Sequence, residues 1–336
     1  EASAVFGAYD YVIFGGGIDQ ENHPEHQYIS DILAHPNMVN TTAFGYIELG
    51  LKGRPADKSD EEMKMLMEKW QALGMDGIFL DEFDYGGATD EVPGVTRLRQ
   101  NSAVGHAHSL GMPVVANAFV PEWAFSSEVH PMHNPTGEAT RLDSNDFYLY
   151  ESHQVGLSEY TPAFIWTDKA NRLKAYHDEI HFNILSNTTV DDGNVYDENA
   201  FFYSWYSALL YGHEATAWGQ ACYSACESAP DLAPFRTPPA INPGTVFTSE
   251  IQSHGNGLYT RQTDIGTIAI EVFDNNETKS IHADNGSIQD GWISYYAPMG
   301  IADAYSTDED QNLAVPAPGV LANDSDEDSE SFTAVK

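Results

Sequence analysis

The chain has 336 residues, of which 42% are hydrophobic, 51 are acidic and 15 are basic, giving a formal net charge of -36. This charge excludes nucleic acid as an expected partner, because phosphate binding needs clustered Lys and Arg side chains. The hydrophobic content is sufficient for a packed core, and no apolar run reaches the length of about 18 residues that would predict insertion into a membrane.

Apolar runs typical of buried strands alternate with helical patterns along most of the chain. The predicted strands are residues 9–14, 42–47, 77–80, 113–119, 146–151, 181–186, 215–219 and 266–273. The predicted helices are residues 28–33, 59–74, 95–110, 168–179 and 198–210. Eight strands alternating with helices at spacings of roughly 30 to 40 residues predict an α/β fold, a (β/α)8 TIM barrel. A doubly wound open sheet is the alternative.

The helix predicted at residues 59–74 has distinct start and stop signals. Ser59 and Glu62 have the spacing of a capping box, in which each side chain accepts a hydrogen bond from the other residue's backbone. Gly74 is the residue type that ends helices in a left-handed conformation. Met63 and Trp70 lie on one face at helical spacing, which indicates core packing and not a cofactor site.

The composition changes after residue 300, because residues 301–336 contain nine acids and one base. Segments 304–310 and 318–328 resemble the opening strands of the cadherin-like tandem repeats of large bacterial secreted and adhesive proteins. The resemblance implies a barrel at 1–300, the start of a β-repeat or linker at 301–336, and further domains of a larger extracellular or cell-surface protein. Closely spaced Asp and Asn oxygens there would suit calcium. An unstructured acidic tail is the alternative.

Cys222 and Cys226 are spaced for either a local disulfide or two free thiols. The disulfide follows if the protein is extracellular. No further ligand type lies beside them at the spacing of a zinc site, so apart from calcium in the acidic segment we predict neither a metal site nor a cofactor.

Carboxylates follow two of the predicted strands at the point where each strand ends. Asp81 and Glu82 come directly after the apolar run 78–80, and Glu151 ends the run 147–150. Active sites of parallel barrels lie at the carboxyl ends of the strands, and glycoside hydrolysis needs two carboxyls, one acid and one nucleophile or base. We therefore expect Asp81 to be the nucleophile or stabiliser, Glu151 the general acid and Glu82 a third member. Consecutive strand residues face opposite sides, so at most one of Asp81 and Glu82 faces the barrel mouth unless the strand has turned.

The stretches Gly45-Tyr46-Ile47, Gly53-Arg54-Pro55, Trp70 and residues 76–82 resemble the spherulin-4-like glycosidases in order and spacing. The resemblance continues at residues 114–117 and 148–151 and covers about residues 9 to 190. It implies a (β/α)8 barrel that hydrolyses α-1,4-linked galactosamine or N-acetylgalactosamine polymers of microbial exopolysaccharide. The chain departs from the family at residues 118–119, which are Ala-Phe where the family has Pro-Gly. Glu82 stands where the related endo-α-1,4-polygalactosaminidases have Asn.

Several aromatic and polar side chains are expected at or beyond strand ends, where they could contact a polysaccharide: Tyr46, Asn117, His153, Trp166 and Trp218. A structural role is the alternative for His153 and for each Trp. The competing function is a non-catalytic carbohydrate-binding or adhesive barrel whose acids bind a cationic sugar. The acidic surface itself suits either a saline environment or a positively charged ligand.

We expect removal of residues 305–336 to leave the cooperative melting of the barrel nearly unchanged, because the change of composition marks the end of the folded unit. Calorimetry of the full and shortened chains measures this. A collapse of the melting transition in the shortened chain would show that the tail is an integral part of the barrel.

Overall fold

A computed structural model describes the part of the chain that carries the expected barrel. The described residues are 2–15, 17–50, 58–85, 95–156, 159–189, 196–219, 236, 246–255, 258–263, 267–272, 281–282, 288–289 and 292–293. The chain divides into two compact units, residues 1–237 and 238–336. The expected boundary near residue 300, the two cysteines and the acidic segment with its expected calcium lie outside the described residues.

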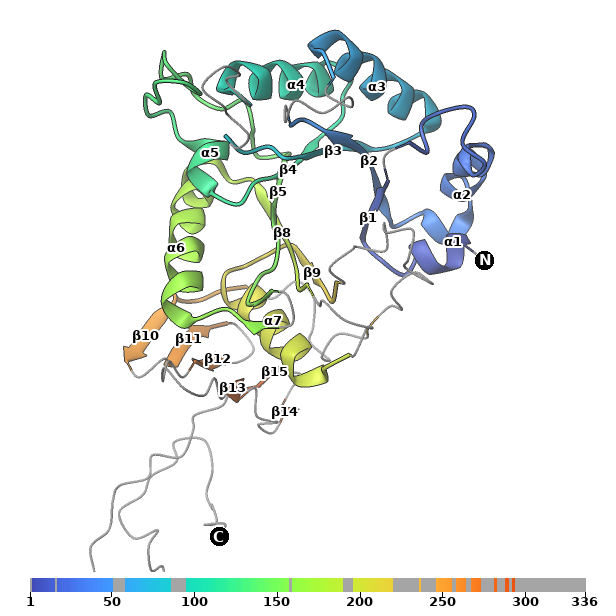
Figure 1. The fold of residues 1–336 in the computed structure, drawn as a ribbon. Helices are drawn as coiled ribbons and strands as arrows, with labels where there is room; N and C mark the ends of the chain where they lie inside the picture. The colour runs from blue at the N-terminus through green and yellow to red at the C-terminus, as the bar shows by residue number, and fades with distance from the viewer. Residues whose placement is uncertain are drawn as a thin grey trace, which may run out of the picture. The chain divides into compact units, whose positions relative to one another are not determined.

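The first unit contains a seven-stranded parallel sheet that curls into a nearly closed α/β barrel of the TIM type (Figure 1). Neighbours in the sheet follow one another along the chain, in the order β1-β2-β3-β4-β5-β8-β9. Their bounds are β1 Tyr11–Phe14, β2 Thr42–Glu48, β3 Gly77–Asp81, β4 Val114–Asn117, β5 Phe147–Tyr150, β8 Asn183–Asn187 and β9 Ala215–Ala217. All carboxyl ends therefore open on the same end of the barrel.

Helices follow the strands and lie on the outer side of the sheet (Figure 1). They are α1 Ala2–Phe6, α2 Ile29–Leu33, α3 Asp60–Leu73, α4 Arg97–Ser109, α5 Pro121–Phe125, α6 Ala163–Ile180 and α7 Glu198–Leu210, with the 3-10 turns η1 His26–Tyr28 and η2 Pro36–Met38. A short hairpin, β6 Val155–Gly156 with β7 Glu159–Tyr160, precedes α6. Among the described residues, no helix is both long and apolar enough to cross a bilayer.

Apolar side chains from alternate positions of the strands fill the interior of the barrel. The buried members of this cluster are Phe44, Phe79, Val115, Phe147, Leu149 and Leu185. Rings from distant strands meet there, and Phe44 and Phe147 pack edge to face with centroids 5.5 Å apart. Because side chains alternate along a strand, the residues two positions further on point to the same interior at the carboxyl ends.

The helix α3 forms as its sequence signals predicted. The Ser59 backbone N–H donates to Glu62 Oε2 at 2.8 Å, the Glu62 N–H donates to Ser59 Oγ at 3.3 Å, and Gly74 ends the helix with φ 99°. Trp70 is fully buried and donates from Nε1 to the Tyr46 carbonyl at 3.2 Å. This helix is therefore tied directly to β2.

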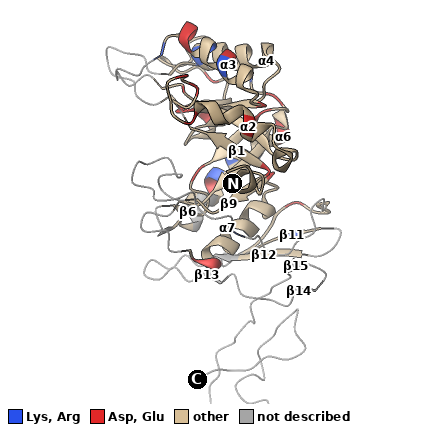
Figure 2. Ribbon diagram, turned by 90° about the vertical axis from the view of Figure 1, so that its right-hand side faces the viewer, with Lys and Arg blue, Asp and Glu red and all other residues tan. Residues whose placement is uncertain are grey.

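Acidic residues are visible on the outer helices, drawn red in Figure 2. The first turn of α3 carries Asp60, Glu61 and Glu62. Negative charges at a helix amino terminus interact favourably with the helix dipole. Part of the large negative charge thus stabilises this helix.

The strand expected at residues 266–273 as the eighth of the barrel was assigned wrongly. Residues Thr267–Val272 form β12, which pairs antiparallel with β11, Leu258–Gln262. Only four residues connect the two strands, whereas a parallel crossover needs a dozen or more, so a hairpin is the available connection. The second unit holds the antiparallel sheet β10-β11-β12-β13 and the pair β14-β15, with the remaining bounds β10 Gln252–Gly255, β13 Ile281–His282, β14 Ile288–Gln289 and β15 Trp292–Ile293.

We expect the substitution Gly45→Ala to destabilise the fold by about 1–3 kcal/mol, because a Cβ at this position would lie 2.3 Å from the Trp70 ring. Urea unfolding measures the change. Gly15→Ala is the matched control, since a Cβ there meets no atom of the described, non-adjacent residues within 4 Å. Equal unfolding midpoints for the two variants would contradict the close packing of Trp70 on β2.

Candidate active site

Asp81, the last residue of β3, is held by three hydrogen bonds at the carboxyl end of the barrel. The Tyr46 hydroxyl of β2 donates to Oδ2 at 2.6 Å, and the Asn117 amide of β4 donates to Oδ1 at 3.0 Å. The backbone N–H of Glu82 donates to Oδ1 at 2.8 Å. Both oxygens act as acceptors, which is the hydrogen-bonding role of an ionised carboxylate. Donors from two neighbouring strands thus fix the orientation of this group.

The same Asn117 amide nitrogen also contacts Glu151, which follows β5. Nδ2 lies 3.1 Å from Glu151 Oε2 and 3.0 Å from Asp81 Oδ1. Since one atom contacts both oxygens, these oxygens lie no more than about 6 Å apart. Four of the residues expected at the site, Tyr46, Asp81, Asn117 and Glu151, are therefore brought together as one connected group.

The backbone turns sharply after each of the two carboxylates. Glu82 has φ 53° and Ser152 has φ 55°, a left-handed conformation that non-glycine residues adopt rarely. The turn after Glu151 is held by Asn187 Oδ1, which accepts from the Ser152 N–H at 3.2 Å. Such strained residues persist where surrounding contacts determine them, and they cluster at functional sites. Each carboxylate residue thus directly precedes a residue with a constrained, left-handed backbone.

Glu82 differs from its neighbours in the direction of its side chain. A Cβ built on Gly50 would lie 1.7 Å from Glu82 Oε2, so this side chain is packed against the Gly50 backbone. Asp81, by contrast, points to Asn117 in the interior. The side chains of Asp81 and Glu82 thus point to different sides, as expected for consecutive residues. Glu82 bonds to Asp81 through its backbone N–H.

Three other residues expected to bind the substrate are outside the hydrogen-bonded group around Asp81 as the described residues show it. His153 is fully buried, and its ring contacts Tyr150 and His213 with centroids 4.6 and 4.7 Å away. Tyr150 follows the interior residue Leu149, so this contact lies on the outer face of the sheet. Trp218 directly follows β9, the strand-end position expected for it, and packs edge to face on Phe201 of α7, at 6.2 Å.

Trp166, the third of these residues, lies within α6, which begins five residues before the start expected from the sequence. The sequence places it after the β6–β7 hairpin and not at the end of a barrel strand. Its side chain is outside the described part of the structure.

Lys169 of α6 is a charged residue close to the site that the sequence reasoning missed. Its ammonium nitrogen lies 4.1 Å from the centroid of the Tyr150 ring. Burial lowers the pKa of Lys169 to about 8, while the negative charge of Glu151 acts in the opposite direction. One feature of the sequence could have indicated that Lys169 faces the barrel. It lies four residues before Leu173, which is buried, so both side chains lie on one face of the helix.

A hollow of about 600 Å³ lies at the opposite end of the barrel, where the strands begin. Thr42, Phe147 and Asn183 open strands β2, β5 and β8, and all three line the hollow. His108 and Asp143 also line it. This is the end of the barrel at which residues usually serve stability and not catalysis.

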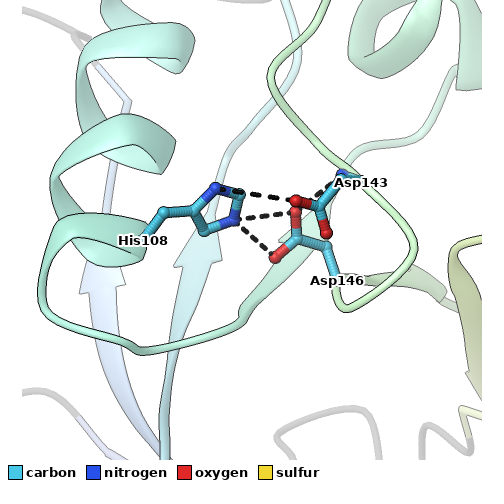
Figure 3. A group of neighbouring side chains, drawn as sticks. All are labelled: His108, Asp143 and Asp146. Carbon is cyan, nitrogen blue, oxygen red and sulfur yellow. Dashed lines mark hydrogen bonds and ion pairs between the residues drawn. The ribbon is translucent and has the colours of Figure 1, made fainter.

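His108, Asp143 and Asp146 lie beside this hollow and could offer ligand atoms to a metal ion (Figure 3). Asp146 is fully buried and already accepts from His108 Nε2 at 3.0 Å and from the backbone N–H of Val114 and of Asp143 at 2.8 Å each. Burial raises the pKa of Asp146, and these donors oppose the shift. A carboxylate with this many donors is a structural tie between α4, β4 and β5.

No family model and no curated protein matches this sequence. Similar solved structures include an O-GlcNAc hydrolase variant from Thermobaculum terrenum, with 12% identity, a TM-score of 0.39 and coverage of 67% of this chain and 52% of that one. They include Aspergillus fumigatus Ega3 in complex with galactosamine, with 11% identity, a TM-score of 0.36 and coverage of 57% and 80%. They also include the carboxyl transferase domain of Rhizobium etli pyruvate carboxylase, with 10% identity, a TM-score of 0.37 and coverage of 64% and 34%.

The chain spans about half the length of the O-GlcNAc hydrolase structure. Glycoside hydrolases are thus among the structural neighbours, together with enzymes of unrelated chemistry. At TM-scores this low the likenesses carry no weight for fold or function. The barrel rests on its own strand order, and the site rests on the hydrogen bonds around Asp81.

We expect the free energy of unfolding to decrease as the pH falls below about 6.5. Burial lowers the pKa of His213 to about 3 and that of His153 well below its usual range, so both imidazoles stay neutral in the folded protein. In the unfolded chain the same two imidazoles take up protons near pH 6.5. The stability that they contribute is therefore fully present above pH 6.5, and it is lost as the pH falls towards their lower pKa values in the folded protein. Urea unfolding between pH 7 and 5 measures the slope.

The variant His213→Gln should show a shallower loss over this range, because it removes one of the two imidazoles whose pKa is lowered in the folded protein. His181→Asn is the control, since His181 is exposed and its φ of 64° suits Asn. A slope that is the same in the wild type and in both variants would mean that His213 is protonated in the folded state.

Proposed function

We propose that this protein is a glycoside hydrolase that cleaves an amino-sugar polysaccharide with Asp81 and Glu151. The observation that carries the proposal is the Asn117 amide, whose single nitrogen contacts both carboxylates. Two carboxyls from different strands thereby face one point at the carboxyl end of a parallel barrel. Paired carboxyls flanking the scissile bond are what glycoside hydrolysis requires.

The spacing of the two carboxylates favours a mechanism that retains the anomeric configuration. Retaining enzymes have carboxyls roughly 5–5.5 Å apart, whereas inverting enzymes leave room for a water at about 6.5–9.5 Å. The limit of about 6 Å set by Asn117 lies nearer the first arrangement. A direct attack by one carboxylate on the sugar is therefore the simpler chemistry for this site.

In the first step an Asp81 oxygen bonds to the anomeric carbon while the bond to the leaving sugar oxygen breaks. The protonated carboxyl of Glu151 gives its proton to that oxygen. In the second step Glu151 takes a proton from water, the water oxygen bonds to the anomeric carbon, and the bond to Asp81 breaks. Asp81 is again a free carboxylate and Glu151 is again protonated, so the net reaction is the addition of one water across the glycosidic bond.

Asp81 suits the nucleophile because its orientation is set before the substrate arrives. The Tyr46 hydroxyl and the Asn117 amide hold its two oxygens, and neither donor has to reorganise during the reaction. Glu82 acts in this scheme through its backbone N–H, which donates to the same carboxylate. A catalytic role for the Glu82 carboxyl itself stays a prediction, and the variant Glu82→Gln described below tests it.

The substrate class follows from charge and from the family resemblance together. A formal charge of -36 attracts a cationic polymer, and partly deacetylated α-1,4-linked galactosamine carries free amino groups. The resemblance to spherulin-4-like glycosidases supports this polymer as the substrate. The resemblance of residues 301–336 to cadherin-like repeats supports an extracellular place within a longer protein.

We expect Asp81→Asn and Glu151→Gln each to lower the rate of hydrolysis on the order of 10³-fold or more, because each keeps the shape and removes the acid. Reducing-end release from deacetylated galactosamine polymer measures the rate. The control is Glu68→Gln, an exposed acid on α3. Glu82→Gln, tested beside them, should fall less than either because its side chain is turned towards Gly50.

Near-full hydrolysis by both Asp81→Asn and Glu151→Gln would refute the assignment of the site. A wild-type protein that binds the polymer without cleaving it would be a carbohydrate-binding barrel, the alternative expected from the sequence. A product of inverted configuration would contradict the retaining mechanism while leaving the carboxylate pair in place.

A further inference from the structure

Phe119 is a large, exposed apolar side chain that follows β4 at the end of the barrel where the carboxylate pair lies. It follows Asn117 by two residues, and 62% of its surface is accessible to solvent. A single exposed hydrophobic residue is ordinary on a protein surface. This one is unusual in its position, because Asn117 is the residue whose amide contacts both carboxylates.

The backbone that carries Phe119 is fixed on both sides. The Asn117 carbonyl accepts from the Phe83 N–H at 2.8 Å, and the Ala118 carbonyl accepts from the Tyr148 hydroxyl. The helix α5 begins at Pro121, directly after this segment. The Phe119 ring is therefore presented by a rigid support, and a ligand that contacts it does not have to order a loop.

The position of Phe119 just after β4 places it at the carboxyl end of the barrel. Val115 belongs to the interior cluster and Asn117 points to the carboxylates. Ala118 is buried, and its carbonyl is bound by Tyr148, a residue of the outer face. Phe119 lies in the bend between β4, which ends at Asn117, and α5, so its backbone belongs to the same end of the barrel as Asn117.

Other aromatic residues that follow the strands at this end of the barrel pack against one another. Tyr85, four residues after Asp81, is buried and stacks on His133 with centroids 4.9 Å apart and on Trp123 at 6.2 Å. Arg97 lies over the same Tyr85 ring. Phe119 differs from this packed group because most of its ring faces solvent.

We propose that Phe119 is a stacking platform for one pyranose ring of the substrate, in a subsite adjacent to the carboxylate pair. This inference rests on the proposed function and extends it to a specificity-determining residue. An aromatic ring binds the apolar C–H face of a sugar, and its negative π-face also attracts a nearby ammonium group. In a galacto-configured ring the axial oxygen on carbon 4 gathers the C–H groups of carbons 3, 4 and 5 on one face. A galactosamine unit therefore suits Phe119 better than a glucosamine unit.

The test compares Phe119→Ala, Phe119→Tyr and the control Met65→Ala, an exposed apolar residue of α3. KM and kcat are measured on deacetylated galactosamine polymer, and Kd on galactosamine and glucosamine oligomers. We expect Phe119→Ala to raise KM about three- to tenfold with kcat nearly unchanged, as loss of a stacking contact does. Phe119→Tyr should stay close to the wild type, because the ring face is kept. All variants should melt as the wild type does.

The outcomes separate this inference from the proposed function. If the wild type hydrolyses the polymer and Phe119→Ala has an unchanged KM, the stacking platform is wrong and the hydrolase stands. If the wild type binds galactosamine oligomers without cleaving them, a three- to tenfold rise of Kd in Phe119→Ala still supports the platform. Equal loss of affinity for galactosamine and glucosamine oligomers overturns the preference for the galacto configuration. A wild type that neither binds nor cleaves overturns both proposals.

Discussion

A single amide group, the Nδ2 of Asn117, joins two carboxylates that would otherwise repel each other. When both are ionised, two unit charges at the limiting separation of about 6 Å and an effective dielectric constant of about 20 repel by roughly 3 kcal/mol. Asn117 donates to one oxygen of Asp81 and one of Glu151, and the Tyr46 hydroxyl adds a further donor to Asp81. The arrangement of the site depends on these donors, because they offset the repulsion and fix the direction of both groups.

The parallel register of the barrel brings these groups to one level. Tyr46 pairs with Phe79, Phe79 with Val115, and Val115 with Phe147, so the inward positions of β2 to β5 advance together along the barrel. Below them the interior is apolar and includes Phe79 of β3. The polar groups therefore lie where the packed interior ends, close to a low-dielectric region that strengthens their interactions.

The outer face of the same strands carries a second polar layer with a different character. Tyr150, His153 and His213 pack against one another behind the sheet, and Lys169 lies over the Tyr150 ring. Burial keeps the two imidazoles neutral and lowers the pKa of Lys169 to about 8. The chain thus places Glu151 between an inner group of hydrogen-bond donors and an outer cation whose charge is sensitive to its surroundings.

The sequence by itself determined the barrel, the helix that begins at Ser59 and the identity of the residues at the strand ends, because period and capping are local properties. It could not place the strand 266–273 or the buried ring of His153, since strand partners and the face of a buried ring depend on residues far away in the chain. It identified Tyr46, Asp81, Asn117 and Glu151 one by one. Only the tertiary structure decided that they share one network, because hydrogen bonds between strands depend on register, which no local pattern encodes.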